Sequence, residues 1–465
     1  MVVNNESRQT MDVQLEKGQE VLLTIKSIGI NGEGIGFYKR KAVFVDGVMP
    51  PEVVVVRIID VKRTFAYGEI IRIKKRAYYR THPFCKYYGV CGGCQLQHIA
   101  YDEQLRLKED LLKQAFERYA PKVYDETLFH AFTPLNTLHR YRHKAQMPVM
   151  QTKTGVVAGL YKKQTMDLLA IPDCPVQHPT LNHVIYKALT MCDEADVRAF
   201  DAKTMRGLLR HIVARISQAT GEVQLTLVVS ILSTVLKPLA EKLLSIDDVV
   251  SVAISVRHDA KNHEVFGNQV EVVAGKQFIV ESIRDVEVAL GPKAFYQINP
   301  EAAYAMIDHI ETLFDASDES LCDMFTGSGA MALAFAHRFK HVVGIDVSQA
   351  SIDSAKENAK RNQFKQVKFI CDDATNALKG LFEAKETFDV MMFDPPRTGL
   401  SPKLIEQLLK KPVKKLVYVS CNPSTLAKDI EKLGKHYHVK SITPFDMFPH
   451  TSHVESVTLL SLKTA

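Results

Sequence analysis

The 465-residue sequence lacks several features that would place it in a familiar class of protein. It has no run of about 18 apolar residues, the minimum for a membrane span, and it begins with MVVNNESRQT, which lacks the basic and then apolar pattern of a secretion signal. Its eight cysteines are too few at this length for a disulfide scaffold. We therefore expect a cytoplasmic protein with no membrane partner, whose thiols are free for metal binding or nucleophilic chemistry.

Composition and charge indicate a globular protein with one basic end. Hydrophobic residues make up 46% of the chain and charged residues 24%, and at about 150 residues per domain the length suggests about three domains. The formal charge is +6, and residues 1–80 hold 14 Lys and Arg against 9 Asp and Glu, so the rest is almost neutral. A basic module on a neutral body favours a nucleic-acid grip, although a small domain kept soluble by its charge remains an alternative.

The pattern of apolar residues predicts a multidomain α/β protein. Short β-rich runs broken by glycine between residues 18 and 76 predict a small closed barrel of the OB kind, and FYKRK, from Phe37 to Lys41, mixes aromatic and basic side chains as nucleic-acid binding requires. Residues 101–120 form an amphipathic helix pattern, and residues 125–285 alternate strand-like with helical runs. From about residue 290 the regular alternation predicts a doubly wound parallel sheet.

These patterns divide the chain into three predicted domains, which are residues 12–76, 77–288 and 289–465. The middle domain contains HRYRHK, from His139 to Lys144, which could line an RNA path or could be a solvated strand end.

Three cysteines lie within ten residues, at Cys85, Cys91 and Cys94, and Cys174 in IPDCPVQHP is a distant fourth candidate. Thiolates bind zinc or iron–sulfur clusters, and a nearby His82 or His98 could complete a zinc site, so the spacing alone leaves both metals open. Three further cysteines stand alone in apolar contexts and are predicted to fill cores, namely Cys192, Cys322 and Cys371.

A nucleotide-like cofactor is predicted by LCDMFTGSGAMALAFAHRF, which has the pattern of a strand, a glycine turn and a helix. Gly327 and Gly329 would let a ligand approach the backbone, and Asp346 ends the next strand 19 residues after Gly327, where it can bind ribose hydroxyls. These glycines by themselves also allow a nicotinamide cofactor.

Reactive side chains follow the later strands of the same sheet. FDVMMFDPPRTGL places Asp394 and Arg397 around a rigid pair of prolines, and LVYVSCNPSTLAKDI places Cys421 at the same edge. Glu455 stands at the start of the last apolar strand, where a carboxylate has no obvious structural use, so we expect a base with a raised pKa. Arg397 is expected to keep Cys421 partly in the thiolate form.

Taken in order, these motifs resemble the RNA uracil-C5 methyltransferases, and in particular the bacterial 23S ribosomal RNA (uracil-5-)-methyltransferases. The resemblance covers nearly the whole chain: the barrel looks like a TRAM domain, CKYYGVCGGC resembles a cluster motif, and FYQINP, DPPRTGL, VSCNPSTLAKD and DMFPHTSHVE resemble catalytic blocks. It implies S-adenosylmethionine as the methyl donor, 23S rRNA as the substrate with tRNA as the alternative, and a monomer.

The resemblance also implies a role for individual residues. Cys421 would be the nucleophile and Glu455 the general base. Gln297, Phe325, Asp346 and Asp394 would bind the cofactor, with Asp346 in a place where many relatives carry Glu. A [4Fe-4S] cluster would be ligated by Cys85, Cys91, Cys94 and Cys174.

The residues also support this chemistry without the family. A thiolate that adds to carbon 6 of uracil makes carbon 5 nucleophilic enough to take a methyl group, and a base then removes the hydrogen of carbon 5. Cytosine-C5 methylation is a weaker reading because those enzymes carry a second cysteine after their paired prolines, where this chain has Arg397. A non-catalytic RNA-binding protein would have to keep Cys421, Glu455 and Asp394 by accident.

Overall fold

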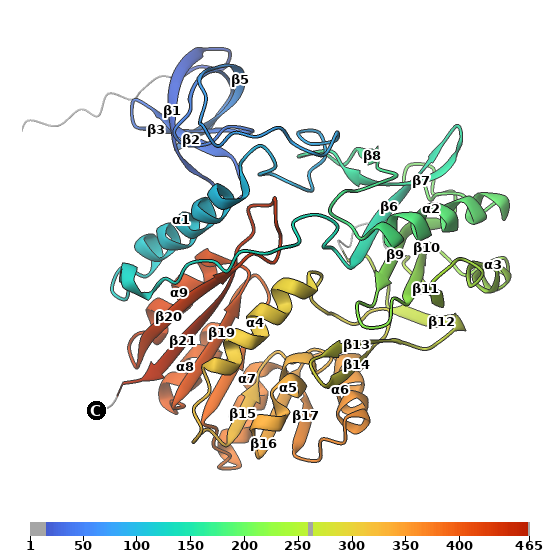
Figure 1. Cartoon of the computed structure of the whole chain (residues 1–465), viewed down its shortest axis with the longest axis vertical. Helices are drawn as coiled ribbons and strands as arrows, with labels where there is room; N and C mark the ends of the chain where they lie inside the picture. Colours follow the sequence, from blue (N-terminus) through green and yellow to red (C-terminus); the bar gives the residue numbers. More distant parts are fainter. Residues whose placement is uncertain (1–14, 259–263, 464–465) are drawn as a thin grey trace, which may run out of the picture. The chain divides into compact units, whose positions relative to one another are not determined.

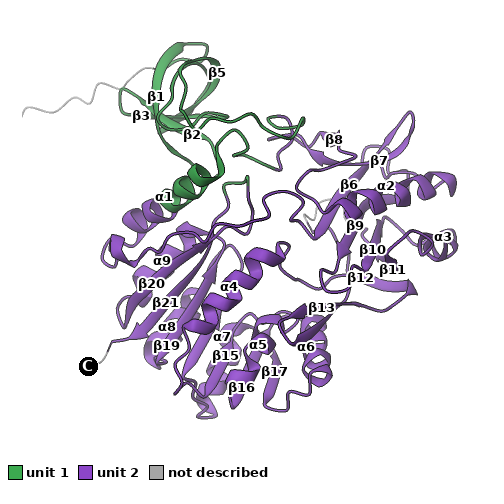
Figure 2. Ribbon diagram, viewed as in Figure 1, with its two compact units in different colours: residues 1–89, 94–111, 450–452 green, residues 90–93, 112–449, 453–465 purple. Residues whose placement is uncertain are grey.

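A computed structural model describes residues 15–258 and 264–463, which form two compact units (Figure 2). The first unit contains the described residues up to Gly89 together with Cys94–Leu111 and His450–Ser452; the second contains Val90–Gly93, Leu112–Pro449 and the described residues from His453 onwards. In the described part of the chain, no helix has the length and apolar character needed to cross a membrane.

The first unit is built on a closed five-stranded barrel with the strand order β1-β2-β3-β5-β4 (Figure 1). Its strands are β1 (Glu20–Ile28), β2 (Gly34–Tyr38), β3 (Lys41–Val45), β4 (Val53–Val61) and β5 (Phe65–Lys75). Along β1 the residues Val21, Leu23 and Ile25 are buried and alternate with exposed neighbours, because successive side chains of a strand point to opposite faces. The predicted small barrel is confirmed.

The predicted amphipathic helix is also present, as α1 (Tyr101–Tyr119), and the boundary between the units falls within it. Its later residues Leu112 and Phe116 are buried in the core of the second unit.

The middle of the chain forms a mainly antiparallel seven-stranded sheet with the order β12-β11-β10-β9-β6-β7-β8, where only β10 and β11 pair in parallel. Its strands are β6 (Lys144–Thr152), β7 (Gly155–Tyr161), β8 (Leu168–Ala170), β9 (Leu209–Ile216), β10 (Val223–Val229), β11 (Val249–Val256) and β12 (Gln269–Gly275). It carries the helices α2 (Pro179–Glu194) and α3 (Leu236–Leu243), and the short turn η1 (Glu126–Leu128) precedes it. A hairpin follows, made of β13 (Ile279–Ile283) and β14 (Val286–Leu290).

The last part of the chain forms a second seven-stranded sheet, the C-terminal sheet, with the order β17-β16-β15-β18-β19-β21-β20. Its strands are β15 (Ser320–Asp323), β16 (His341–Asp346), β17 (Val367–Cys371), β18 (Val390–Phe393), β19 (Lys415–Ser420), β20 (Tyr437–Phe445) and β21 (Glu455–Leu462). The first five strands are parallel and β21 is antiparallel to both of its neighbours, which confirms the predicted doubly wound sheet.

Helices lie on the two faces of the C-terminal sheet (Figure 1), and a hydrophobic core is formed on each face. One contains side chains of α4 (Pro300–Thr312), α5 (Ala330–Ala334) and α6 (Gln349–Arg361), and the turn η2 (Ala336–Arg338) follows α5. The other contains side chains of α7 (Ala374–Glu383), α8 (Pro402–Lys410) and α9 (Pro423–Leu433). The result is a three-layer domain whose loops at the carboxyl ends of the strands are free for chemistry.

Candidate active site

The strand order of the C-terminal sheet reverses between β15 and β18, and open α/β sheets bind their ligands at the carboxyl ends of the strands at such a point. Asp323 ends β15, and Asp394 directly follows β18. The predicted cofactor and catalytic residues therefore start from the place in the sheet where a ligand site is expected.

The turn after β15 requires glycine. Gly327 and Gly329 have φ angles of 55° and 84°, in the left-handed region that other residues avoid, and a Cβ atom on Gly329 would lie 3.0 Å from that of Ala355 on α6. Glycine at these two positions therefore allows the left-handed turn, and at Gly329 it also allows the turn to pack closely against α6.

Asp346 joins the ends of two neighbouring strands. Its Oδ2 accepts a hydrogen bond from the Gly327 N–H at 3.0 Å, and its Oδ1 accepts one from the Ser348 N–H at 2.8 Å. The carboxylate is therefore held beside the glycine turn, and each oxygen keeps a lone pair for a ribose hydroxyl.

One pocket collects the other predicted cofactor residues. Gln297, Phe325 and Asp394 line it together with the glycine turn and apolar side chains of α4 and α5. Oγ of Ser328, which also lines the pocket, is buried and has no hydrogen-bond partner in the described chain. A hydroxyl left in this way fits a polar group of S-adenosylmethionine, because a buried polar atom is costly unless it is paired.

The loop after β18 is fixed to the start of α9. The carbonyl of Arg397 accepts hydrogen bonds from Nδ2 of Asn422 at 3.0 Å and from Oγ1 of Thr425 at 3.2 Å, and Asp429 Oδ2 accepts one from the Leu400 N–H at 2.8 Å. Asn422 also caps α9 by accepting from the Ser424 N–H. These bonds hold the Asp394–Arg397 turn next to Cys421, which lies between the end of β19 and the start of α9.

The thiol of Cys421 is half-buried and is surrounded by charged groups. Burial and the neighbouring Glu455 raise its pKa above the usual 9.0, and the hydrogen bond and charge of Arg397 lower it by less. The predicted effect of Arg397 is therefore present but does not prevail, because burial and two nearby carboxyl groups favour the neutral thiol.

Glu455 begins β21 and is only 5% exposed. Burial and the charge of Asp394 raise its pKa well above its usual value of 4.5, against a smaller opposing effect of Arg397. The pKa of Asp394 is itself raised to about 7 by burial and by Asp323. The raised pKa expected for Glu455 from its position in the sequence agrees with this environment.

Sequence reasoning missed Asp323. This residue is fully buried at the end of β15, and its pKa is raised to about 7 by burial, with a further contribution from Asp346. Together with Asp346, Asp394 and Glu455 it makes a cleft rich in carboxyl groups. An acidic residue directly before a glycine turn was the available signal, since that position is the carboxyl end of the strand.

Comparison with known proteins assigns the family. The family model for tRNA (uracil-5-)-methyltransferases matches residues 100–463, and the model for the TRAM domain matches residues 14–71. The chain belongs to this family. As its sequence predicts, it is an RNA (uracil-C5)-methyltransferase that depends on S-adenosylmethionine.

Individual relatives cover nearly all of this methyltransferase. An uncharacterized RNA methyltransferase of Bacillus anthracis is 37% identical over 457 residues, which is 97% of this chain and 98% of the relative. An uncharacterized RNA methyltransferase of Streptococcus mutans is 35% identical, over 96% of this chain and 98% of the relative. The crystal structure of the Pyrococcus abyssi tRNA (uracil-54, C5)-methyltransferase in complex with S-adenosyl-L-homocysteine matches with a TM-score of 0.73 and 25% identity, over 94% of this chain and 98% of that one.

The predicted cluster cysteines of the methyltransferase are divided between its two units, with Cys85 and Cys94 in the first and Cys91 and Cys174 in the second. Among residues 15–258 and 264–463, no group of three or more His, Cys, Asp or Glu side chains has an arrangement that could hold a metal ion. The N–H of Gly93 donates a hydrogen bond to Sγ of Cys91 at 3.4 Å. The iron–sulfur site stays a prediction.

The prediction for the three isolated cysteines has a clear outcome. Cys192 and Cys322 are buried as predicted, but Cys371 is exposed at the end of β17, because the strand stops there and its side chain leaves the core. Asp373, which follows the same strand, accepts hydrogen bonds from the Thr375 and Asn376 N–H groups and so caps α7.

Proposed function

We propose that this methyltransferase acts on carbon 5 of a uridine in 23S rRNA and gives 5-methyluridine, through a transient bond between Sγ of Cys421 and carbon 6 of the base. The observation that carries the proposal is the mutual electrostatic influence of Cys421, Arg397, Asp394 and Glu455 at one edge of the sheet. Asp394 also lines the pocket that contains Gln297 and Phe325, so a methyl donor there would lie beside the same groups.

Carbon 5 of uracil is too weak a nucleophile to take a methyl group directly, and covalent addition at carbon 6 divides the reaction into easier steps. When bound, S-adenosylmethionine supplies a methyl group on a positively charged sulfur, and that charge favours the ionised forms of nearby carboxyl groups. Gln297, Phe325 and Asp346 would hold the donor, with Asp346 on the ribose hydroxyls.

Cys421 loses its proton inside the cleft before it attacks. Its raised pKa keeps the thiol neutral at rest, and Asp394, with a pKa of about 7, is partly ionised at neutral pH and is a suitable acceptor. Arg397 lowers the pKa of Cys421 and so stabilises the thiolate that forms. The sulfur then bonds to carbon 6, and the electron pair of the ring double bond moves towards carbon 5.

Glu455 completes the reaction. After methylation, carbon 5 carries both a hydrogen and the methyl group, and the Glu455 carboxylate removes that proton as the C6–S bond breaks. The double bond re-forms and Cys421 leaves as a thiolate. The burial that raises the pKa of Glu455 also makes its carboxylate a stronger base than an exposed glutamate.

The substrate RNA must present the uridine outside a base stack, since the thiol cannot reach a stacked base. In the barrel, Phe37 is 55% exposed next to the Lys39 and Arg40 turn, which supports the predicted RNA contact of the TRAM domain. The ribosomal target is inferred from the motif pattern, and a tRNA uridine is the alternative, supported by the tRNA substrate of the Pyrococcus abyssi enzyme.

Mapping of 5-methyluridine in rRNA and tRNA from a strain that lacks this chain tests the target. Loss of the modification from 23S rRNA, with restoration by the wild-type protein and not by Cys421→Ala, is the expected result. Loss only from tRNA would replace the rRNA assignment, and an unchanged pattern in both RNAs would contradict the activity.

We further infer that Cys85, Cys91, Cys94 and Cys174 ligate a [4Fe-4S] cluster, on the basis of the resemblance of CKYYGVCGGC to a cluster motif and of the N–H···S bond at Cys91. The methyl transfer above needs no redox step, so the cluster would organise the fold or the RNA surface. Anaerobically purified protein should contain iron and sulfide in equal amounts, and zinc alone or no metal would contradict the assignment. We expect the protein to be a monomer and to be located in the cytoplasm.

A further inference from the structure

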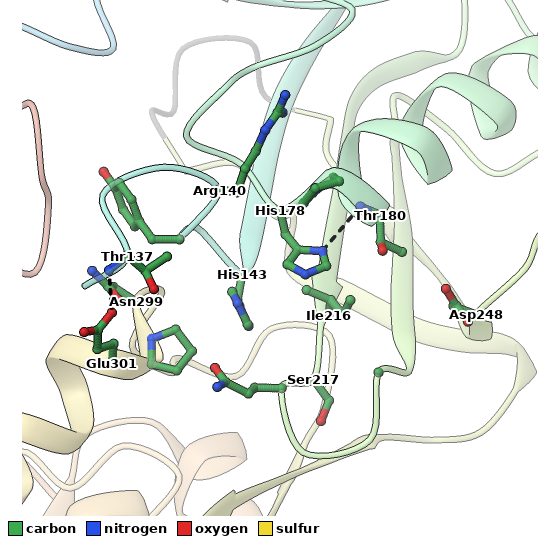
Figure 3. A pocket seen from close by; sticks show the side chains of 15 residues that line it. Thr137, Arg140, His143, His178, Thr180, Ile216, Ser217, Asp248, Asn299 and Glu301 are labelled. Carbon is green, nitrogen blue, oxygen red and sulfur yellow. Dashed lines mark hydrogen bonds between the residues drawn. The ribbon is translucent and has the colours of Figure 1, made fainter. Parts of the chain in front are cut away.

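A large cavity in the second unit lies apart from the cofactor pocket. Its volume is about 570 Å³, within the range of about 300–1,000 Å³ of small-ligand sites, and neither Cys421, Asp394 nor Glu455 lines it. Four segments and one further residue form its wall: residues 137–143 before β6, residues 178–180 at the start of α2, residues 216–221 at the end of β9 and after it, residues 299–301 at the start of α4, and Asp248 (Figure 3).

Two imidazole rings face this cavity. The rings of His143 and His178 meet edge to face with their centroids 5.2 Å apart (Figure 3). Burial lowers the pKa of His143 to about 4, and burial and Arg140 lower that of His178, so both rings are neutral at physiological pH. Nδ1 of His178 accepts from the Thr180 N–H, whereas the buried Nδ1 of His143 has no hydrogen-bond partner in the described chain.

The cation of the wall is paired, and its remaining charges are carboxylates. The guanidinium of Arg140 donates two hydrogen bonds to the carboxylate of Asp173, and the carboxylate of Glu301 accepts hydrogen bonds from the N–H groups of Asn136 and Thr137. The remaining Asp248 is negative and exposed. A phosphate would therefore gain little here, whereas a neutral heteroaromatic group could stack on the imidazoles and form hydrogen bonds with the wall.

A small neighbouring cavity connects this wall to the cofactor-binding segment. It shares His143, Ile216 and Pro300 with the large cavity, and Tyr296 and Gln297 with the cofactor pocket. Its lining includes Arg215, 5% exposed, and Glu281, 2% exposed. Nη1 of Arg215 and Oε2 of Glu281 are buried without a hydrogen-bond partner in the described chain. Polar groups that are left unpaired here indicate a site that a ligand or water completes.

We propose that the large cavity binds a second, extruded nucleobase of the RNA substrate, one that is not methylated. Proteins that read RNA by sequence bind unstacked bases on aromatic or histidine rings and on polar side chains, and both features are present in this wall. The proposal rests on the proposed function, because it makes the cavity a selectivity site for the RNA that presents its uridine to Cys421. The same segment, residues 296–301, then forms part of both sites.

Filling the cavity tests this proposal. Thr180 lies at the rim on the first turn of α2, and Thr180→Trp would occupy the space of a base; Thr190→Trp, at an exposed position further along the same helix, is the matched control. The probes are rRNA and bulk tRNA from a strain without the protein. We expect Thr180→Trp to raise the Kd and KM for the substrate RNA by about tenfold, which corresponds to the lower part of the range of free energies for the loss of one stacked base. The Kd for S-adenosylhomocysteine should stay unchanged.

A second variant covers the case in which Thr180→Trp does not fold. His143→Leu keeps a side chain of similar bulk and removes both ring stacking and the unpaired Nδ1. It should raise the Kd for the RNA, as Thr180→Trp does. Ultraviolet cross-linking of the RNA to Cys421→Ala protein should then attach a nucleotide to the peptide that contains residues 137–143.

The outcomes separate the two proposals. Equal RNA affinity of wild type, Thr180→Trp and His143→Leu, all folded, would overturn the base-binding cavity even if methylation is confirmed. If the wild type methylates no RNA but the Thr180→Trp variant still loses RNA affinity and the Thr190→Trp variant does not, the activity fails while the RNA site stands.

Discussion

The two ends of the C-terminal sheet differ in how their buried carboxyl groups are paired. At the amino end of β19, Nζ of Lys415 is 2.6 Å from Oδ2 of the fully buried Asp318 and 2.9 Å from Oδ2 of Asp315. At the carboxyl end of the same sheet, Asp323 and Glu455 are buried and Asp394 is half-buried, and desolvation raises the pKa values of all three.

The physical difference lies in the partners. Burial alone would raise the pKa of Asp318, but its bonds to Lys415 and Lys414 lower it below the usual value of 3.8. The carboxyl end has Arg397 as the partial counter-charge of Glu455 and Cys421. A buried carboxylate with a lysine partner stays ionised, whereas buried carboxyl groups without a full partner cost stability and can exchange protons near neutral pH. Four variants test this contrast, from the largest expected effect to the smallest.

Removal of the nucleophile should have the largest effect. Cys421→Ala should abolish methylation and the covalent RNA adduct, because no other thiol lies between β19 and α9, while S-adenosylhomocysteine still binds. Tritium release from RNA labelled at carbon 5 of uridine and a denaturing gel of the adduct measure the two effects. Cys192→Ala, at a buried position in α2, is the control, and residual turnover in Cys421→Ala would contradict the mechanism.

Loss of the proposed general base, Glu455, should stop the reaction after methyl transfer, at the removal of the proton from carbon 5. Glu455→Gln should slow turnover by about 10²–10⁴-fold, the usual contribution of a general base, and the RNA adduct should accumulate because carbon 5 keeps its proton. The same gel shows this accumulation. A slow variant without any adduct would mean that Glu455 acts before the sulfur–carbon bond forms.

Breaking the pair at the amino end should affect stability and leave the chemistry intact. Asp318→Asn leaves Lys415 buried without its main partner, which costs about 3–5 kcal/mol. Because the folded pKa of Asp318 is lowered, the wild type has this stability above about pH 4 and loses it as the pH falls through the folded value, so the difference between variant and wild type should shrink in acid. Urea unfolding at a series of pH values from 8 down to about 2 measures it, and a difference that stays constant below about pH 4 would contradict the pairing.

At Asp323 we expect a substitution to change the free energy of unfolding in the opposite direction. Its folded pKa of about 7 exceeds the unfolded value of about 3.9, so the wild type loses stability as the pH rises between these values. Asp323→Asn should therefore stabilise the protein at pH 8, by on the order of 1 kcal/mol or more, and change little at pH 4. The gain should come with weaker binding of S-adenosylhomocysteine, and a loss of stability at pH 8 would show that Asp323 is paired.

Much of this site could be predicted because its chemistry lies in short segments. Each of these residues lies at the end of a recognisable strand or in the turn next to it: Gly327, Asp346, Asp394, Cys421 and Glu455. Parallel strands bring their carboxyl ends to one edge of the sheet. The regular alternation after residue 290 therefore predicted both the sheet and the edge.

What escaped prediction depends on long-range partners. The sequence suggested that Arg397 would favour the thiolate of Cys421, yet the burial and the carboxyl groups that outweigh it come from β15, β18 and β21. Cys371 also reads as a core residue until the end of its strand is known.

The sequence by itself determined the barrel, the doubly wound sheet and which side chains we propose as reactive groups, because periodicity and motifs are local properties of the chain. Only the tertiary structure decided which buried charges are paired, that Asp323 joins the carboxyl groups of the cleft, and that His143 meets His178 in a separate cavity. Those results depend on the distances between segments far apart in the chain, and electrostatic and desolvation energies follow those distances rather than the order of the residues.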